Sequence, residues 1–210
     1  THYGMRITDN VIEDIFNKLI EKSNYKKRKA EINNFNKKNK VLKKGIAITP
    51  VKFGISFTTT HLNQGGALVH IYTDGSIHLN HGGIEMGQGL MTKLALVASN
   101  EFGLNYENIK ISSTDTEKVP NTSASAASAT TDINGAAIVN AINNIKSGLN
   151  EFIYDYFKTN NKIKYENNFV YFDKRKISFK ELINTAYLNR IPLSSSGFYK
   201  TDKINVNTKS

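Results

Sequence analysis

The sequence predicts a mixed α/β (α+β) fold in which helices pack against mixed sheets. Three features support this class: apolar residues at helical spacing near the start, strand-like runs between Gly45 and His81, and alternating short strands and helices beyond. The 210 residues, 39% of them hydrophobic, are enough to bury a core. Because no repeat and no break in composition divides the chain, we expect residues 1–210 to belong to one domain.

Two helices are expected first. One carries apolar residues three and four positions apart, and the next runs from about Tyr25 to Asn39. Basic clusters in and after this second helix contribute much of the formal net charge of +10. Ile32 and Phe35 interrupt the clusters at the spacing of one apolar stripe, which favours a solvated helix face over a surface for nucleic acid or acidic membranes. The apolar residues of the first helix are Val11, Ile12, Ile15, Phe16, Leu19 and Ile20.

The pattern between Gly45 and His81 is typical of strands. Four short runs are rich in β-branched and aromatic residues. Asp74-Gly75 separates the last two runs and is the strongest short hairpin signal in the chain. The expected strands are Ile46–Thr49, Gly54–Thr58, Ala67–Tyr72 and Ile77–Leu79.

Helices and strands then alternate. A helix with one apolar face begins near Leu90 and ends at Gly103, a residue suited to the left-handed C-terminal position. A long helix reaches Tyr156, and Thr131 or Asp132 is expected to cap its start. Between these helices we expect a strand at Ile109–Ile111 and an ordered, Ser/Thr/Ala-rich loop at Ser112–Thr131.

Three small elements are expected near the C-terminal end. Lys162–Phe172 predicts a hairpin, and Leu193–Tyr199 predicts a final strand. Ser178, followed three residues later by Glu181, forms a capping-box pattern that predicts a helix as far as Leu188. The residues after Thr201 show no pattern.

The most informative segment is His81–Gly89, which places four glycines around Glu85, Met86 and Gln88 directly after a predicted strand. Glycine lets the main chain approach a ligand closely, and free N–H groups at the start of the following helix suit an anionic or electron-rich group. The residues from Gly87 onward lack the third glycine of a dinucleotide fingerprint, and no phosphate-binding P-loop is present. A tight strand-to-helix turn without a ligand is the alternative interpretation.

Composition excludes several kinds of site. The chain has no cysteine, so these residues form neither a disulfide nor a thiolate-held metal or iron–sulfur centre. No apolar run approaches the roughly 20 residues that a membrane helix requires. The basic clusters occur without zinc-finger spacing or an RNA-binding aromatic signature. Charge alone therefore identifies no partner.

Four motifs follow one another along the chain: Lys52–Thr58, Gly66–Ser76, His81–Gly89 and the segment from Val119-Pro120-Asn121-Thr122-Ser123 to Ala126-Ala127-Ser128. In the same order they resemble the molybdopterin-binding region of the xanthine dehydrogenase/oxidase family of molybdenum hydroxylases. The resemblance covers most of the chain and implies a domain that is part of a larger multidomain protein. The aldehyde oxidase branch shares the Glu-Met-Gly-Gln-Gly core, but the other motifs resemble the xanthine branch more.

The resemblance implies a molybdenum–molybdopterin cofactor and the hydroxylation of purines, hypoxanthine to xanthine to urate, with oxygen derived from water. Electrons would pass to 2Fe–2S clusters, FAD and NAD, which other parts of the full-length enzyme bind. The cofactor performs the redox chemistry, while the protein supplies position and electrostatics. No residue of this chain is expected to ligate the metal directly.

The resemblance also implies roles for individual residues. The glycine loop is expected to run beside the cofactor through Met86, Gly87 and Gln88, whose amide offers hydrogen bonds. Phe57 is expected to pack on the flat purine, and Thr58 to make a neighbouring polar contact. A second loop is expected to bind the pterin with N–H and hydroxyl groups from Ala127, Ser128, Ala129, Thr130 and Thr131.

Each of these residues also has an ordinary structural interpretation. Phe57 and Met86 could belong to the core, Gln88 could close its own turn, and Thr130 and Thr131 could cap a helix. Glu85 is not expected to be the catalytic base, because the family's base lies in a Gly-Glu-Pro-Pro segment that this chain lacks. No catalytic residue is therefore expected here, and the segment alone is expected to be inactive.

Two departures from the family pattern affect the expected shape of the pocket. Met91 stands where the family usually has histidine, and Ala124 replaces a proline. The whole protein is expected to be a cytoplasmic, alternatively peroxisomal, homodimer that binds no nucleic acid or membrane. Its partners are expected to be the purine substrate and the rest of the same polypeptide. An aldehyde oxidase-type enzyme and a non-catalytic basic binding module remain the alternatives.

Overall fold

The computed structural model describes residues 6–51, 53–118 and 121–202. The chain divides into two compact units, residues 1–54 with 207–210, and residues 55–206. Lys52, Val119 and Pro120, which belong to the motifs above, and the patternless tail from residue 203 lie outside the described residues. The expectation of one domain over the whole chain stays a prediction, and each unit is described by itself.

The first unit contains the two expected helices, α1 (Ile12–Lys22) and α2 (Tyr25–Lys38). Its lysines are largely solvated, as the apolar stripe predicted. The Lys44 ammonium lies 4.1 Å from the centre of the Phe35 ring, and Lys43 donates to the Asn39 carbonyl at 2.6 Å. Lys44 thus makes a cation–π contact with Phe35, and Lys43 binds carbonyls near the end of α2.

Two of the expected strands do not form. Residues 46–49 and 54–58 join no ladder among the described residues. Ser56 has a φ of 81°, which interrupts an extended run, and its N–H donates instead to the Ala127 carbonyl at 3.0 Å. Alternation of apolar residues predicts a strand only where a neighbouring edge is available, and here none pairs with these segments.

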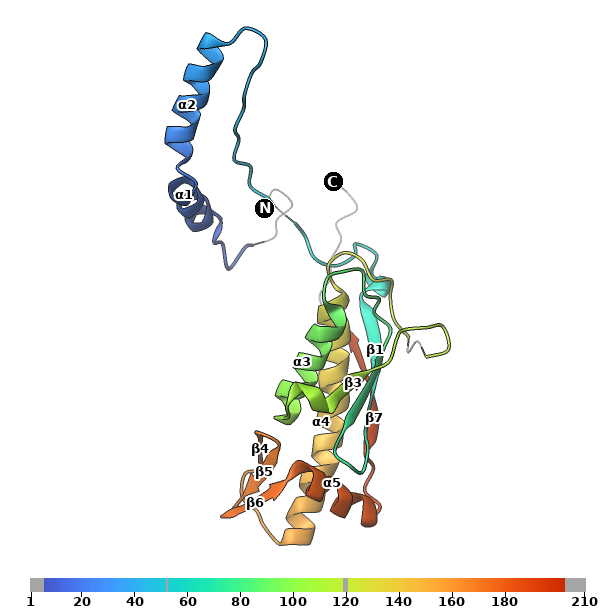
Figure 1. Ribbon diagram of the computed structural model, residues 1–210. Coiled ribbons are helices and arrows are strands. Elements are labelled where there is room, and N and C mark those ends of the chain that lie inside the picture. The colour runs from blue at the N-terminus through green and yellow to red at the C-terminus, as the bar shows by residue number, and fades with distance from the viewer. Residues whose placement is uncertain (1–5, 52, 119–120, 203–210) are drawn as a thin grey trace. The chain divides into compact units, whose positions relative to one another are not determined.

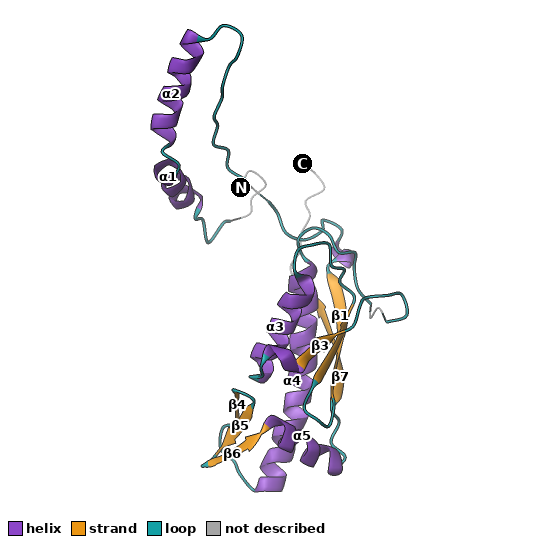
Figure 2. Cartoon of the chain, viewed as in Figure 1, coloured by secondary structure: helices purple, strands orange, loops and turns teal. Residues whose placement is uncertain are grey.

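The second unit is built on a four-stranded mixed sheet in the order β3-β2-β1-β7 (Figures 1 and 2). β1 (Gln64–Ile71) pairs antiparallel with β2 (Ile77–His81) and with β7 (Ser194–Lys200). β3 (Ile109–Ile111) runs parallel to β2. Asp74 accepts the Ser76 N–H in the turn between β1 and β2, which confirms the predicted hairpin.

Two helices cover one face of this sheet (Figure 1). α3 (Leu90–Phe102) packs against α4 (Thr130–Phe157), and α4 contacts both β1 and β7. Burial explains the layer, because the apolar faces of both helices meet the alternate, inward side chains of the strands. Fully buried members of this core include Leu79, Leu94, Ile138, Ile142 and Leu149.

A small antiparallel sheet and a short helix complete the unit. Its strands are β4 (Lys164–Glu166), β5 (Phe169–Phe172) and β6 (Arg175–Ser178), the last of which the sequence did not predict. α5 (Phe179–Leu188) begins after Ser178, whose hydroxyl accepts the Glu181 N–H at 3.2 Å as the capping pattern predicted. The segments η1 (Thr60–Leu62) and η2 (Tyr106–Asn108) are short 3₁₀ turns.

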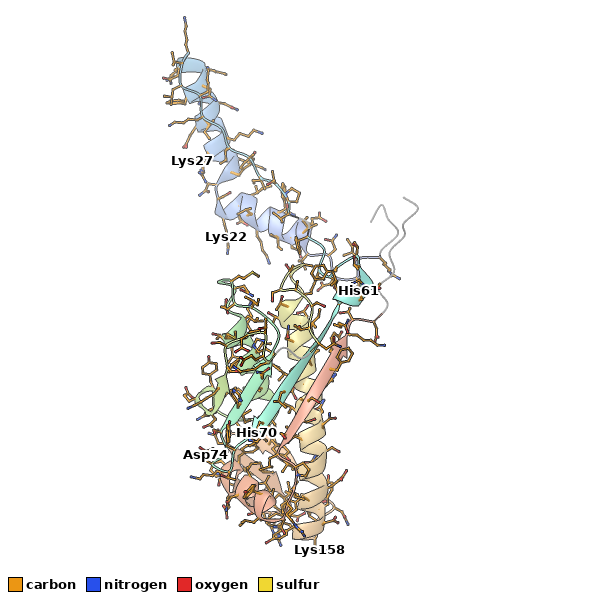
Figure 3. The ribbon with its side chains drawn as sticks, turned by 90° about the vertical axis from the view of Figure 1, so that its right-hand side faces the viewer. Lys22, Lys27, His61, His70, Asp74 and Lys158 are labelled. Atoms are coloured by element: carbon orange, nitrogen blue, oxygen red, sulfur yellow. The ribbon has the colours of Figure 1, made fainter. Side chains whose placement is uncertain are left out.

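The sheet and helices place the connecting loops at defined ends. Figure 3 shows Asp74 and Lys158, the turn after β1 and the end of α4, in the same part of the second unit, and His61, just before β1, at the other end. The start of α4 and the loop before α3 lie toward the His61 end (Figure 1). Within the described part of the chain, no helix combines the length and apolarity needed to cross a membrane.

Candidate functional site

Two loops meet where β2 ends and α4 begins. The first loop (residues 82–89) leads into α3, and the second loop (residues 119–131, described from 121) leads into α4. The Ile84 N–H donates to the Ser125 hydroxyl at 2.7 Å and joins them directly. A Cβ on Gly82 would overlap the Thr122 side chain, and one on Gly83 would lie 2.8 Å from the Thr130 methyl group. Glycine here therefore permits close approach between the loops themselves.

The first loop is fastened by its own side chains. The Glu85 carboxylate accepts the N–H groups of Gly87 and Gly89, each at 2.9 Å, and that of Met91 at 3.2 Å. These backbone donors, Gly89 first, hold the pKa of Glu85 below its ordinary value. An ionised carboxylate at the start of α3 is a helix cap and an unsuitable proton acceptor, in agreement with its exclusion as the base.

Gln88 closes the same loop. Its Oε1 accepts the Met86 N–H at 2.6 Å, and its Nε2 donates to the Ile84 carbonyl at 2.8 Å. The structure therefore agrees with the alternative interpretation, in which the Gln88 side chain closes its own turn. A primary amide has two N–H groups, and the second remains available to a ligand.

His81 fixes the base of the first loop. The imidazole is buried, and its Nδ1 accepts the Gly83 N–H at 3.0 Å, so the neutral ring carries its proton on Nε2. Burial lowers the pKa of His81 to about 4. The Thr114 hydroxyl contacts the carbonyls of His81 and Gly83 at 3.1 and 2.7 Å. The loop therefore starts from a rigid, uncharged anchor.

The second loop is held in a less favourable backbone conformation. Ala127 and Ser128 both have a φ of 54°, in the left-handed region that residues with a Cβ rarely adopt. Ala129 stands at the N-cap of α4 without a side-chain cap, so neither Thr131 nor Asp132 caps this helix as predicted. The prediction failed because α4 begins two or three residues earlier than expected, with Thr130 as its first residue. The first turn of α4 therefore has no side-chain cap, and two of its residues, Thr130 and Thr131, line the pocket between the loops.

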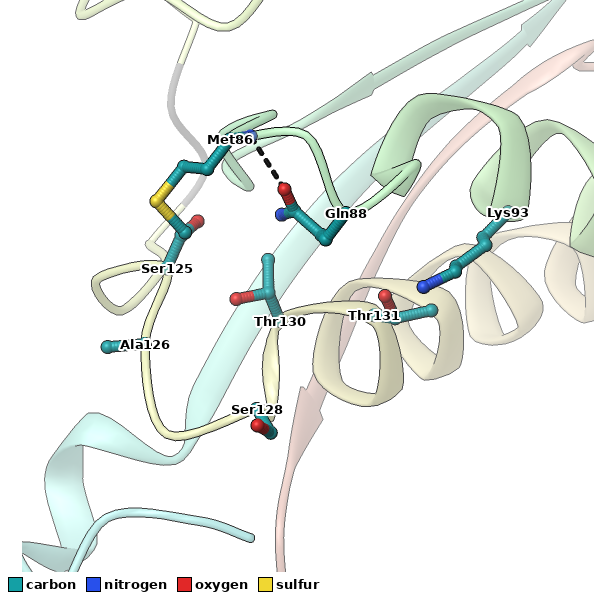
Figure 4. A pocket seen from close by; sticks show the side chains of 8 residues that line it. All are labelled: Met86, Gln88, Lys93, Ser125, Ala126, Ser128, Thr130 and Thr131. Atoms are coloured by element: carbon teal, nitrogen blue, oxygen red, sulfur yellow. Dashed lines mark hydrogen bonds between the residues drawn. The ribbon is translucent and has the colours of Figure 1, made fainter. Parts of the chain in front are cut away.

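A pocket of about 430 Å³ lies between the two loops and the starts of α3 and α4 (Figure 4). A volume of this order suits a cofactor-sized ligand. Hydroxyl groups, one amide and one thioether dominate its wall, and a single lysine is the only charged group in it. The lining residues are Met86, Gln88, Lys93, Ser125, Ala126, Ser128, Thr130 and Thr131.

The structure brings together five of the eight residues predicted to bind a cofactor: Met86, Gln88, Ser128, Thr130 and Thr131. Gly87, Ala127 and Ala129 belong to the same two loops and are not among the residues that line the pocket. Phe57 and Thr58, predicted to contact substrate, do not line this pocket. Their segment reaches the second loop through the bond from Ser56 to Ala127, while Asn63 pairs with the Phe57 N–H and carbonyl at 2.8 and 2.9 Å.

Three lining residues were not predicted from the sequence. Ser125 and Ala126 belong to the second loop and could have been found by extending the predicted set by two positions. Lys93 lies in the first turn of α3, four residues after Gly89, where its N–H donates to the Gly89 carbonyl. Helical spacing from the end of a ligand-binding loop is the signal that would have identified Lys93.

Residues 18–210 match the model of the molybdopterin cofactor-binding domain. The chain belongs to this family. It is 44% identical over 207 residues to xanthine dehydrogenase/oxidase of Gallus gallus and 39% identical over 204 residues to xanthine dehydrogenase of Dictyostelium discoideum. These alignments cover 99% and 97% of the chain and 14% of each relative, so the chain spans about one seventh of their length.

Solved structures share the fold of this molybdopterin-binding domain. The copper- and molybdenum-containing CO dehydrogenase superposes with a TM-score of 0.60 at 20% identity, covering 68% of this chain and 19% of that one. Quinoline 2-oxidoreductase of Pseudomonas putida 86 gives 0.61 at 19% identity, covering 67% and 19%. The predicted mixed α/β class, part of a molybdenum hydroxylase domain, is confirmed.

The residues present fit a molybdopterin. A Cβ built on Gly87 or Gly89 meets nothing within 4 Å, so this part of the first loop leaves room on its outer side. Behind the loops, His81 Nε2, Thr122 Oγ1 and Asn134 Oδ1 are buried without a partner among the described residues. None of these three residues lines the pocket. The hydroxyl groups of Ser125, Ser128, Thr130 and Thr131 and the Gln88 amide, which do line it, suit a polar heterocycle better than an apolar ligand.

Proposed function

We propose that this domain binds the molybdenum cofactor of a xanthine dehydrogenase-like hydroxylase whose substrates are purines. One observation carries the proposal: two loops of a chain that belongs to the molybdopterin-binding family converge on one polar pocket of about 430 Å³. When bound, the cofactor would supply the redox chemistry that hydroxylates the substrate with oxygen from water. The protein residues bind and orient that cofactor.

The roles of the lining residues follow from their chemistry. From one side, Gln88 offers its second amide N–H, and the exposed residues Met86 and Gly87 offer their carbonyls, because their N–H groups are already bonded to Gln88 and Glu85. Ser128, Thr130 and Thr131 offer hydroxyl and N–H groups from the other. Both sides are fixed before binding, the first by Glu85 and the second by its contact with Ser56, which limits the entropy lost when the ligand binds.

Phe57 is the proposed purine contact. Its ring is half-buried, and Asn63 fixes its backbone on both sides, so the ring has a defined place close to the second loop. An aromatic face suits a planar heterocycle, and Thr58 adds an exposed hydroxyl beside it. The catalytic base, the 2Fe–2S clusters, FAD and the NAD site would belong to other parts of a cytoplasmic homodimer, and this segment alone would be inactive.

The test uses the full-length protein that contains this chain. Purified protein should contain molybdenum and molybdopterin in equal amounts and should oxidise hypoxanthine and xanthine with reduction of NAD. Phe57→Ala should raise KM for xanthine while leaving molybdenum content unchanged, because the ring contacts substrate and not cofactor. Aldehyde oxidation without xanthine oxidation would indicate an aldehyde oxidase-type enzyme instead. Protein without molybdopterin would disprove the cofactor proposal.

A further inference from the structure

One charged residue of the pocket has no assigned role. Lys93 is the only ionised side chain in its wall, and it extends from α3 toward Thr131 at the start of α4 (Figure 4). The ion pairs found among the described residues are Lys118–Asp115 and Lys164–Glu166, so Lys93 is not neutralised by the described part of the protein. The one carboxylate of the first loop, Glu85, is already engaged by three backbone N–H groups.

The position of Lys93 is unfavourable for its own helix. It occupies the first turn of α3, where the helix dipole is positive and repels a cation. Opposite it, α4 presents a first turn with no side-chain cap, whose N–H groups add further positive potential. The Glu85 carboxylate already accepts the N–H groups at the start of α3, and Asp132 lies in the first turn of α4. The Lys93 ammonium and the α4 N–H groups that have no side-chain cap are therefore the donors that an anionic ligand group would contact.

We propose that Lys93 is a positioning residue that contacts the phosphate of molybdopterin, across the pocket from Thr130 and Thr131. The assignment rests on the proposed cofactor function and deepens it. Molybdopterin carries one phosphomonoester, a dianion near pH 7, and the other lining groups of this pocket are uncharged. An ammonium group and the first-turn N–H groups of a helix are the donors that such a group prefers.

The test compares three variants of the full-length protein. Lys93→Gln removes the charge and keeps the length of the side chain, whereas Lys93→Arg keeps the charge. Lys158→Gln is the matched control, because it removes the same charge at the far end of α4, which is about 40 Å long at 1.5 Å per residue. Circular dichroism and thermal unfolding of each variant report whether the fold is intact.

The readout is cofactor binding and not turnover. Apoprotein is titrated with the fluorescent oxidised pterin derived from molybdopterin, either phosphorylated or treated with phosphatase. Lys93→Gln should weaken binding of the phosphorylated pterin roughly three- to tenfold, the range between an exposed ion pair and a hydrogen bond to a charged group. It should leave binding of the dephosphorylated pterin unchanged, and Lys93→Arg and Lys158→Gln should behave as wild type.

The salt dependence of binding gives a second measurement, which uses wild-type protein and therefore does not require that any variant folds. Wild-type affinity for the phosphorylated pterin should fall as chloride rises, and it should fall less steeply for the dephosphorylated form. Equal salt dependence of the two forms, or equal weakening of both by Lys93→Gln, would overturn the assignment of Lys93. Failure of wild-type protein to bind either form would overturn the proposed function itself, so the two failures are distinguishable.

Discussion

The two loops around the pocket obtain their order in different ways. The first loop is organised by its own side chains: Glu85 and Gln88 account for five hydrogen bonds to backbone groups between Ile84 and Met91. The second loop has φ values of 54° at Ala127 and Ser128 and depends on outside contacts from Ser56 and Ile84. Contacts between residues close in sequence thus order the first loop, whereas contacts from other segments hold the second loop in place.

The buried anchor of the first loop should make stability depend on pH. The pKa of His81 is about 4 in the folded protein against an ordinary value of 6.5, so the unfolded chain binds a proton more readily. Stability should therefore be complete above pH 6.5 and fall as pH drops toward 4, by about 2 to 3 kcal/mol. Urea unfolding between pH 7 and 4 measures it. His81→Phe should flatten this dependence; an unchanged slope would exclude His81 as its source.

Adding a side chain at Gly82, where the two loops meet, should lower the free energy of unfolding almost as much. Gly82→Ala places a methyl group against Thr122 and should destabilise the second unit by about 1–3 kcal/mol through overpacking. Urea unfolding of the single variants and of the Gly82→Ala/Thr122→Gly pair provides a double-mutant cycle. Recovery in the pair would locate the damage at the contact between the loops. Additive losses would show that the two residues do not meet.

Loss of the amide that closes the first loop should act on the cofactor more than on the fold. Gln88→Ala removes the acceptor of the Met86 N–H and the donor to Ile84. We expect about tenfold weaker retention of molybdopterin, the equivalent of roughly one to two neutral hydrogen bonds. Molybdenum content after extended dialysis measures the effect. Unchanged content would restrict Gln88 to the turn.

The smallest effect is expected for the carboxylate cap. Glu85→Gln should increase hydrogen exchange at Gly87, Gly89 and Met91, because a neutral amide accepts these N–H groups less strongly. The pKa of Glu85 is lowered in the folded protein, so its contribution is present above the unfolded value of 4.5 and is lost as pH falls through the folded pKa. Asp115→Asn, which neutralises an exposed carboxylate outside both loops, is the control. Equal exchange rates at Gly87, Gly89 and Met91 in the two variants would contradict the capping role of Glu85.

The sequence predicted most of the fold because most of its elements are locally encoded. The helical spacing within α1 and α3, the Asp74-Gly75 turn and the Ser178–Glu181 pattern all reflect interactions between residues a few positions apart. The segments at 46–49 and 54–58 were wrongly expected to be strands, because alternation says nothing about whether a partner edge exists. The cap of α4 failed for a related reason, since the second loop and not a local side chain sets where that helix begins.

Sequence alone determined the family and the composition of both loops, and it named five residues that line the pocket as predicted cofactor contacts, since each is a property of motifs that stay intact in any conformation. Only tertiary structure decided that Lys93 completes the wall and that Gly82 and Gly83 serve contact between the loops. Those facts depend on which segments meet in space, and burial of the sheet against α3 and α4 determines that meeting.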